Sequence, residues 1–518
     1  MSAHAAPSAE PHEIELKFDI TPADLPSLKR RVATIDGRAG RRDIQRLSTT
    51  YFDTDDLKLK AHGVSLRVRE EPGRRLQTVK ASGASGTLDR AEWEREVADS
   101  SPDLSAAADT PVAGLLSSKR ARRELAPVFR TEVQRTSQEI RSGRSVVELA
   151  VDEVRVVAGK RVSAFCEVEL ELKSGDTAGL YTVARDLIDA APLRLGVLSK
   201  AERGYALRER GALQAVKAET PKLVPGMSVV DGFRAIAHGC IRQYRLNEAI
   251  LLQRRDDEAL HQARVALRRL RSAFSLFKTV VADRELEAIK GELRWASEPM
   301  GRARNHDVFL KRATSGHAPQ GADTAEFLEL VKEGRERAYD DVLAVLRSPR
   351  LIALVLRLAE WLERGRWRRR SGDNEERRQE PIEDAAAAIL DSRRRKVRKR
   401  GRHLDRLDPM ARHRVRIQAK KLRYAAEFFA PLCHGKSERR RHAKFVKALK
   451  AMQDGLGTLN DIATGRELAA GLARKRAVAE PAFGAGLIAG AEGSQEPTLL
   501  QEAAAAQRRL AKAKPFWR

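Results

Sequence analysis

The stretch Phe165-Cys166-Glu167-Val168-Glu169-Leu170-Glu171-Leu172-Lys173 decides the fold of the first part of this chain. Successive side chains of a β-strand point to opposite faces of its sheet. One face of this strand therefore carries its glutamates and Lys173, and the other carries a cysteine and aliphatic residues. The alternation predicts a strand with one charged side and one apolar side.

The same alternation recurs in other strands expected between residues 12 and 97. Shared faces are predicted for Glu13, Glu15 and Lys17, for Arg67 and Arg69, for Thr78 and Lys80, and for Arg90, Glu92, Glu94 and Glu96. If these faces meet inside a closed barrel, its interior holds carboxylates for a metal ion and cations for a polyanion. The alternative is an open antiparallel sheet whose polar face is solvated.

The metal expected in such an interior follows from its donors. Carboxylates buried together repel one another unless metal ions or cations neutralise them. Carboxylate and phosphate oxygens suit Mg²⁺ or Mn²⁺ rather than Zn²⁺. The sequence has no Cys/His cluster with the spacing of zinc ligands. We therefore expect Mg²⁺ or Mn²⁺ as the cofactor.

Basic residues are concentrated in the second part of the chain. The 518 residues carry a net charge of +26. Residues 1–220 contain 36 Lys+Arg and 34 Asp+Glu, whereas residues 221–518 contain 62 and 38. The second part is therefore expected to bind a polyanion, such as inorganic polyphosphate, nucleic acid or an anionic membrane surface.

Cysteine usage and hydropathy indicate the compartment. Cys166, Cys240 and Cys433 are far apart, which argues against a disulfide framework and favours a reducing environment. Residues 1–10 lack an apolar signal core, and no apolar run approaches the length of a membrane span. We expect a soluble, cytoplasmic protein without a membrane span.

A change of pattern divides the chain. Strand-like alternation covers residues 11–210, and a proline-containing linker is expected at 211–225. Helical periodicity then covers 226–475, and a low-complexity segment with a final helix is expected at 476–518. Within the last part, residues 480–497 are rich in Gly and Ala and are expected to be loosely ordered.

The first domain resembles CYTH domains, also called triphosphate tunnel metalloenzymes. The resemblance rests on ordered motifs: Glu13-Ile14-Glu15-Leu16-Lys17, Tyr51-Phe52-Asp53-Thr54, Leu66-Arg67-Val68-Arg69, Thr78-Val79-Lys80, Arg90-Ala91-Glu92-Trp93-Glu94, Arg135 after Phe129, Asp152, Glu167 with Glu169, and Ser199-Lys200. It implies an eight-stranded antiparallel β tunnel, or closed barrel, that holds a linear triphosphate.

The resemblance also implies a set of site residues. Substrate phosphates would be bound by Lys17, Arg67, Arg69, Lys80, Arg135 and Lys200. Metal would be bound by Glu13, Glu15, Glu94, Asp152, Glu167 and Glu169. Glu13, Glu15 or a second metal ion would orient the attacking water, and the sequence leaves the choice open. Phosphoryl transfer asks mainly for positioning and charge neutralisation.

Arg135 poses a question of orientation. By simple alternation it shares a face with Thr131 and Val133 rather than with Arg130. Either a bulge turns this strand or Arg130 is the inward residue. The motif favours Arg135.

The basic part contains an internal repeat. Residues 261–271 read HQARVALRRLR, and residues 413–423, 152 positions later, read HRVRIQAKKLR. A weaker echo follows each copy, at residues 301–307 and 457–461. The spacing indicates duplication of half a domain rather than a short solenoid repeat.

On a helix, each copy presents one basic stripe beside an apolar one. The stripes comprise His261, Arg264, Arg268 and Arg271, and His413, Arg416, Lys420 and Arg423. The alternative is that they are ordinary solvated faces. The repeat resembles CHAD domains, all-α helical bundles rich in His, Lys and Arg, and the resemblance implies binding of inorganic polyphosphate.

We therefore expect an α+β protein of two domains with a divalent-metal-dependent inorganic triphosphatase, which converts tripolyphosphate to pyrophosphate and phosphate. The basic helical domain would bind polyphosphate. The alternatives are an adenylate cyclase or an organic (nucleoside or thiamine) triphosphatase of the same fold, and a polyphosphate-binding protein without catalysis. Nucleic acid is a weaker candidate partner, since aromatic residues for base stacking make up 5% of the chain.

Overall fold

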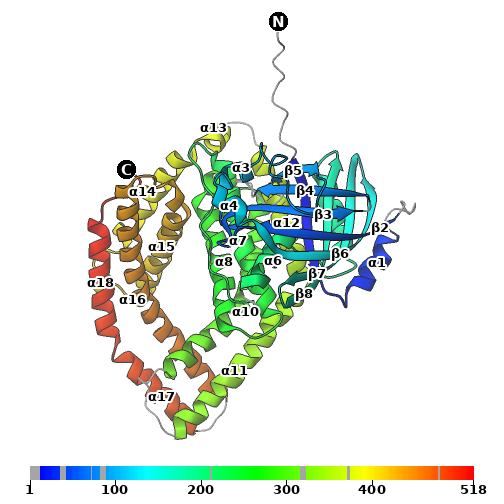
Figure 1. The fold of residues 1–518 in the computed structure, drawn as a ribbon. Coiled ribbons are helices and arrows are strands. Elements are labelled where there is room, and N and C mark those ends of the chain that lie inside the picture. The colour runs from blue at the N-terminus through cyan, green and yellow to red at the C-terminus, as the bar shows by residue number, and fades with distance from the viewer. Residues whose placement is uncertain are drawn as a thin grey trace. The chain divides into compact units, whose positions relative to one another are not determined.

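The protein, studied as a computed structural model, forms two compact units (Figure 1). One comprises Met1–Gln214 with Pro349–Glu360, and the other comprises Ala215–Ser348 with Trp361–Arg518. The structure describes residues 12–34, 42–71, 73–81, 89–209, 213–314, 322–369, 374–475 and 479–518. Within these residues, no helix combines the length and the low polarity that a membrane crossing requires.

The first unit is built mainly from long strands. Its strands are β1 (His12–Ile20), β2 (Asp43–Asp53), β3 (Val64–Glu71), β4 (Arg74–Ala81), β5 (Asp89–Glu96), β6 (Ala126–Ser142), β7 (Ser145–Ala158), β8 (Arg161–Ser174) and β9 (Arg194–Leu195). Its helices are α1 (Leu25–Val32), α2 (Lys58–Ala61), α3 (Pro111–Leu115), α4 (Lys119–Arg123), α5 (Ala178–Ile188) and α6 (Lys200–Glu209).

The sheet closes on itself. Its strands follow the order β5-β4-β3-β2-β6-β7-β8-β1-β9, and β5 also pairs with β1. Strand β1 achieves this by pairing with β5 through His12–Ile14 and with β8 through Glu15–Ile20. All these pairs are antiparallel. The prediction of an eight-stranded antiparallel tunnel is therefore confirmed, with the short β9 added beside β1.

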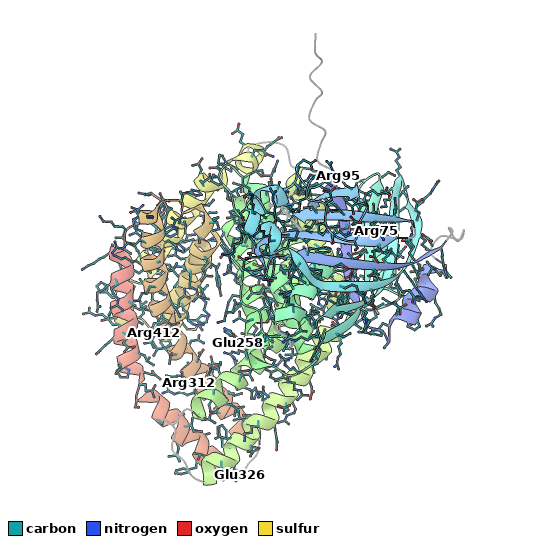
Figure 2. All side chains as sticks on the ribbon, viewed as in Figure 1. Arg75, Arg95, Glu258, Arg312, Glu326 and Arg412 are labelled. Carbon is teal, nitrogen blue, oxygen red and sulfur yellow. The ribbon has the colours of Figure 1, made fainter. Side chains whose placement is uncertain are left out.

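Apolar side chains cover the outside of this ring. Helix α5 packs on β6, β7 and β8. Phe52, Leu66 and Val79 pack with Val112 of α3 in a second outer cluster. On the outer face where no helix covers the strands, polar residues are exposed: Arg75 of β4 and Arg95 of β5 are examples (Figure 2). Because the apolar side chains face outward, the charged faces of the strands are left for the interior.

Helix α6 closes part of the interior. Tyr205 contacts the ring of Phe129 edge-on at 5.1 Å, and Phe129 stacks on Tyr51 at 4.5 Å. The Tyr205 hydroxyl donates to Asp53 Oδ2 at 2.9 Å. A Cβ at Gly204 would lie 2.1 Å from the Phe129 ring, so only glycine allows this approach. The helix therefore fixes the position of Lys200 at its own first residue.

The second unit is helical. Its elements are α7 (Val229–Leu251), α8 (Asp257–Leu276), α9 (Lys278–Val281), α10 (Arg284–Ala313), α11 (Ala322–Arg347), α12 (Pro349–Arg364), η1 (Arg366–Arg368), α13 (Asn374–Gln379), α14 (Ile382–Arg400), η2 (Leu404–Arg406), α15 (Pro409–Phe428), η3 (Ala430–Leu432), α16 (Lys436–Lys475), α17 (Ala479–Gly493) and α18 (Glu496–Lys512). Helix α12 contributes residues to both units.

The repeat seen in the sequence is a repeat of structure. Helix α8 packs on α15, α7 on α14, α10 on α16 and α11 on α17, so these four helices of one half each meet a helix of the other. Asp256 caps the start of α8 and Asp408, 152 positions later, caps the start of α15. At the other ends, Phe277 and Phe429 contact each other with ring centroids 6.1 Å apart. The two halves are therefore related by a local pseudo-two-fold axis.

The expectation that residues 480–497 are loosely ordered is wrong. They form α17 and the start of α18. Ala485 and Ile488 of α17 are buried in a cluster with Phe309, Phe327 and Val331. Burial of this face against α10 and α11 supplies the stability that composition alone does not predict.

Candidate functional site

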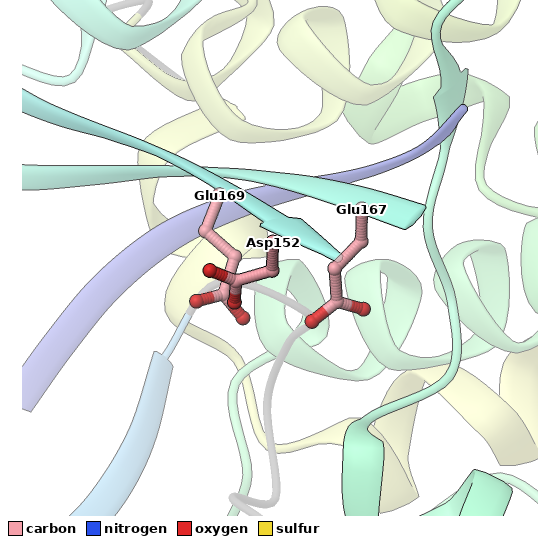
Figure 3. A group of neighbouring side chains, drawn as sticks. All are labelled: Asp152, Glu167 and Glu169. Atoms are coloured by element: carbon pink, nitrogen blue, oxygen red, sulfur yellow. The ribbon is translucent and has the colours of Figure 1, made fainter. Parts of the chain in front are cut away.

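Three carboxylates meet where β7 and β8 pair (Figure 3). Asp152 lies opposite Glu167, and Glu169 is two residues further along the same face of β8. Asp152 and Glu167 are 0% and 1% exposed. One ligand oxygen from each of the three residues lies within 4.8 Å of the others. We call Asp152, Glu167 and Glu169 the carboxylate triad.

Three cations surround the carboxylate triad. Lys200 Nζ lies 2.8 Å from Asp152 Oδ2 and 3.1 Å from Glu169 Oε1, and it also contacts Glu167. Arg135 donates to Asp152 and Glu169. Lys17 Nζ lies 2.8 Å from Glu169 Oε1 and 3.1 Å from Glu15 Oε1. The buried acids are therefore compensated by cations from β1, β6 and α6.

The charges set the protonation states of the carboxylate triad. Burial raises the pKa of Glu169, but Lys17, Lys200 and Arg135 outweigh it and hold this pKa well below its ordinary value. Burial raises the pKa of Glu167 above its ordinary value, because Lys200 offsets the effect only in part. Burial lowers the pKa of Lys200, but the carboxylates outweigh it and raise this pKa well above its ordinary value. Lys200 is therefore an ammonium ion here.

A second charged group lines β3, β4 and β5. Lys80 Nζ lies 2.9 Å from Glu92 Oε2, and Arg67 lies 3.7 Å from the other oxygen of Glu92. Arg69 lies 3.3 Å from Glu94, and Thr78 donates to Glu94 at 3.2 Å. These cations belong to the same closed ring of strands as the carboxylate triad.

The six acids expected to bind metal do not all meet. Three form the carboxylate triad. Glu15 is linked to it through Lys17, whereas Glu94 pairs with Arg69 and lies outside it. Glu13 lies opposite Arg90 in the β1–β5 pairing, and both of these side chains lie outside the described part of the structure.

The Arg135 side chain points into the ring. The strand needs no bulge to place it there, and Arg130 is not the inward residue. Its register with β7 runs without a break, and the one irregularity of the β2–β6 pairing lies at Tyr51 and Phe52. Thr131 and Val133 are buried on the same side as Arg135, because that side is partly apolar where α6 fills it. Arg130 pairs with Glu132 and is half exposed.

In the helical unit, the two basic stripes meet. Helices α8 and α15 pack together, and Arg268 Nε donates to the Tyr424 hydroxyl at 2.9 Å. Positively charged side chains of α8 and α15 repel one another across this contact, and Arg304 of α10 adds to the repulsion. The residues involved, which we call the basic cluster, are His261, Arg264, Arg268, Arg304, Arg416, Lys420 and Arg423.

Mutual repulsion and burial perturb the basic cluster. Burial, Arg268 and Arg416 lower the pKa of Lys420 to about 6. Burial, Arg268 and Arg304 lower the pKa of Arg264 to about 10, and burial and Arg304 lower that of His261 to about 4. Such shifts mark sites where positive charge lacks enough nearby carboxylate. The positive charges of the basic cluster are therefore only partly compensated, by Asp461 at Arg416 and by Glu427 at Arg423.

Two stripe residues differ from this pattern. His413 is exposed, and its Nδ1 lies 2.8 Å from Asn460 Oδ1. Arg271 is also exposed, and burial together with Arg294 lowers its pKa. The stripes are therefore brought together at Arg268 and Lys420, one turn before Arg271.

Family models match both parts of the chain. The model of the CYTH domain matches residues 11–205, and the model of the CHAD domain matches residues 235–470. The chain is a CYTH domain followed by a CHAD domain.

Relatives differ in how much of the chain they share. The "Inorganic triphosphatase" of Haemophilus influenzae is 29% identical over 202 residues, 38% of this chain and 54% of that protein. The chain thus spans about half the length of that relative. An uncharacterized protein of Mycobacterium tuberculosis is 26% identical over 82% of this chain and 84% of its own length. The crystal structure of the CHAD domain from Ricinus communis is 27% identical, covers 58% of this chain and 96% of its own, and has a TM-score of 0.47.

Sequence reasoning missed several residues in these sites. In the CYTH domain, Glu92 forms an ion pair with Lys80, although only Glu94 of this strand was expected to be a site residue. Asp53 accepts a hydrogen bond from the Tyr205 hydroxyl. In the CHAD domain, Arg304 joins the basic cluster. The sequence could have indicated both residues: Asp53 lies within the Tyr-Phe-Asp-Thr motif, and Arg304 lies within the weaker repeat at residues 301–307.

Proposed function

We propose that the CYTH domain hydrolyses inorganic tripolyphosphate to pyrophosphate and phosphate with Mg²⁺ or Mn²⁺. One observation carries the proposal: a single closed ring of strands holds the carboxylate triad, its three cations, and the further cations Arg67, Arg69 and Lys80. Acids for a metal and cations for a chain of phosphates are the two things this reaction requires. The similarity to the Haemophilus influenzae triphosphatase supports the same chemistry.

The carboxylate triad fits a hard divalent cation. Its donors are oxygens from buried carboxylates within 4.8 Å of one another, the type that Mg²⁺ and Mn²⁺ prefer. Asp152, Glu167 and Glu169 would hold the ion, with Glu15 and Glu13 as further candidates. When bound, the ion neutralises charge on the phosphate oxygens and lowers the pKa of water.

The protein's own residues position the substrate. Lys17, Arg135 and Lys200 would bind oxygens of the phosphate that is attacked, and Arg67, Arg69 and Lys80 would bind the remaining phosphates. Water oxygen attacks the terminal phosphorus, the bridging P–O bond breaks, and pyrophosphate leaves with the electron pair. Glu13 or Glu15 would take the proton of the water. The cations offset the charge that develops on the leaving oxygen.

Phosphate release from tripolyphosphate, ATP and thiamine triphosphate, each with Mg²⁺ or Mn²⁺, tests this proposal. We expect tripolyphosphate to be the preferred substrate and Asp152→Ala and Glu15→Ala to abolish most of its turnover. Glu132→Ala, on the exposed side of β6, is the matched control. Preference for ATP would favour the cyclase or organic triphosphatase, and no turnover of any substrate would leave a binding protein.

We further propose that the CHAD domain binds inorganic polyphosphate through the basic cluster. The support is the meeting of two like-charged stripes at Arg268 and Lys420, where lowered pKa values indicate a shortage of carboxylates. A chain of phosphates supplies closely spaced negative charge without the base stacking that nucleic acid would require.

Competition between long-chain polyphosphate and duplex DNA for the full-length protein separates these ligands. We expect polyphosphate to displace DNA, and Arg268→Ala with Lys420→Ala to weaken polyphosphate binding by at least about tenfold, or 1.4 kcal/mol. Arg302→Ala with Lys332→Ala removes the same two residue types from exposed pairs on α10 and α11 and serves as the control. DNA binding that polyphosphate does not displace would refute the assignment.

A further inference from the structure

Lys200 occupies the centre of the carboxylate triad. Its Nζ lies 2.8 Å from Asp152 and 3.1 Å from Glu169 and contacts Glu167, so one ammonium group reaches all three acids. Lys17 contacts Glu169 but neither of the others in the described ion pairs, and Arg135 contacts Asp152 and Glu169. Among these cations, Lys200 is therefore the one that shares the whole set of oxygens a metal would use.

An ammonium ion and a divalent metal cannot share these oxygens. A metal ion at its usual distance of roughly 2.1 Å from carboxylate oxygens would lie in the space that Lys200 Nζ fills. The charges point the same way, because Lys17, Arg135 and Lys200 already offset most of the charge of the three acids and of Glu15, which also pairs with Lys17. Adding a doubly charged ion to a buried and largely compensated group is unfavourable unless a cation leaves or an anion arrives.

Lys200 reaches the carboxylate triad from the end of a helix. It is the first residue of α6, and the residues just before it form no helix or strand. Ser199 and Glu202 bond to each other around it, which fixes the backbone at the start of the helix. The long lysine side chain can therefore swing while the helix stays in place. Arg135, by contrast, extends from the middle of β6 and holds Asp152 with two bonds.

We propose that Lys200 is the resident cation of the carboxylate triad, and that a divalent ion binds there when triphosphate draws Lys200 onto its own oxygens. This inference rests on the proposed function of the CYTH domain. Metal and triphosphate then bind cooperatively, and by linkage each raises the affinity of the other by the same factor. The device keeps the buried acids neutralised in both states.

Mn²⁺ binding without substrate tests the inference. The probe is Mn²⁺ alone, and free Mn²⁺ is measured by electron paramagnetic resonance with the full-length protein. Lys200→Met is expected to bind Mn²⁺ about tenfold more tightly than the wild type, within the 5–150-fold range common for coupled sites. Lys80→Met is the matched control, because Lys80 pairs with Glu92 of β5 within the same ring. It is expected to leave Mn²⁺ affinity unchanged.

Two outcomes overturn the inference: Mn²⁺ affinity of Lys200→Met no higher than that of the wild type, or an equal gain in Lys80→Met. The unmodified protein gives a second measurement if Lys200→Met does not fold. Calorimetry at fixed free Mn²⁺ is expected to show that imidotriphosphate, which is not hydrolysed, binds about tenfold more tightly than without Mn²⁺. No gain would contradict the inference. Wild-type turnover of tripolyphosphate is a separate readout, so the proposed function can stand when this inference fails.

Discussion

Arg135 of β6 holds both carboxylate oxygens of Asp152 on β7, with Nε 2.8 Å from Oδ1 and Nη2 2.7 Å from Oδ2. The two residues lie opposite each other in the strand pairing. A guanidinium fork matches a carboxylate in this way, whereas an ammonium ion acts as a point charge. Asp152 is therefore fixed in orientation before any metal or phosphate binds.

Arg135→Lys keeps the charge and loses the fork. We expect kcat/KM for tripolyphosphate to fall by about tenfold or more, since a charge-assisted hydrogen bond contributes about 1.5–3 kcal/mol. Arg130→Lys, on the same strand but half exposed, is expected to change it less than twofold. Steady-state phosphate release measures both. An equal fall in kcat/KM in the two variants would mean that the paired hydrogen bonds of the Arg135 guanidinium do not contribute to turnover.

Gly204 allows α6 to approach Phe129, so Gly204→Ala is expected to push the helix away. The added Cβ would lie 2.1 Å from the ring, and overpacking typically costs about 1–3 kcal/mol. Calorimetric melting of the full-length protein should show the loss, together with lower turnover because Lys200 moves with the helix. Gly114→Ala in α3 has open space around it and is expected to be neutral or slightly stabilising. A stable Gly204→Ala with normal turnover would contradict this account.

The sequence predicts which residues share a face, because alternation along one strand is local. Glu167 with Glu169, and Arg67 with Arg69, do lie on common faces. Which acids then meet depends on the register between strands, which pairs Asp152 with Glu167 but Thr78 with Glu94. The register arises from packing of the whole ring, so the sequence of a single strand does not predict it. Glu94 therefore lies outside the carboxylate triad, with Arg69 and Thr78 as its partners.

The same limit applies to the CHAD domain. The repeat predicts two basic stripes, and the apolar stripe with Leu260, Leu270 and Phe274 is buried as expected. The contact between Arg268 and Tyr424 could not be predicted, because it depends on how α8 crosses α15. Helix α17 shows the opposite case, in which a sequence of weak pattern becomes helical through burial against its neighbours.

The surroundings of Glu363 lead us to expect that the free energy of unfolding of the CHAD domain depends on pH. It bonds His238 at 2.6 Å and contacts Arg234, both on α7. Burial raises the pKa of Glu363, but His238 and Arg234 outweigh it and lower this pKa to about 2. A depressed pKa contributes stability above the unfolded value of 4.5, and the contribution is lost as pH falls toward 2.

Glu363→Gln resembles the protonated form and should remove this contribution. We expect a loss of about 3 kcal/mol at pH 7, which shrinks as pH falls below 4.5. Chemical denaturation followed by tryptophan fluorescence measures it, with Trp361 and Trp367 buried nearby. Glu298→Gln, an exposed partner of Arg302, is the control and should change little at either pH. A difference independent of pH would show that the ion pairs are not responsible.

We expect Lys420 to take up a proton when polyphosphate binds. Burial, Arg268 and Arg416 lower its pKa to about 6, so the side chain is largely neutral at pH 8. A bound polyanion favours the charged form and raises this pKa, and up to about one proton should then be taken from the buffer. Calorimetry at pH 8 in HEPES and in Tris detects the uptake, because the two buffers release different heats on losing a proton. Lys420→Arg stays charged throughout, so it should keep polyphosphate affinity while the buffer dependence disappears. Equal heats for the wild type in both buffers would mean that Lys420 is already protonated or lies away from the bound chain.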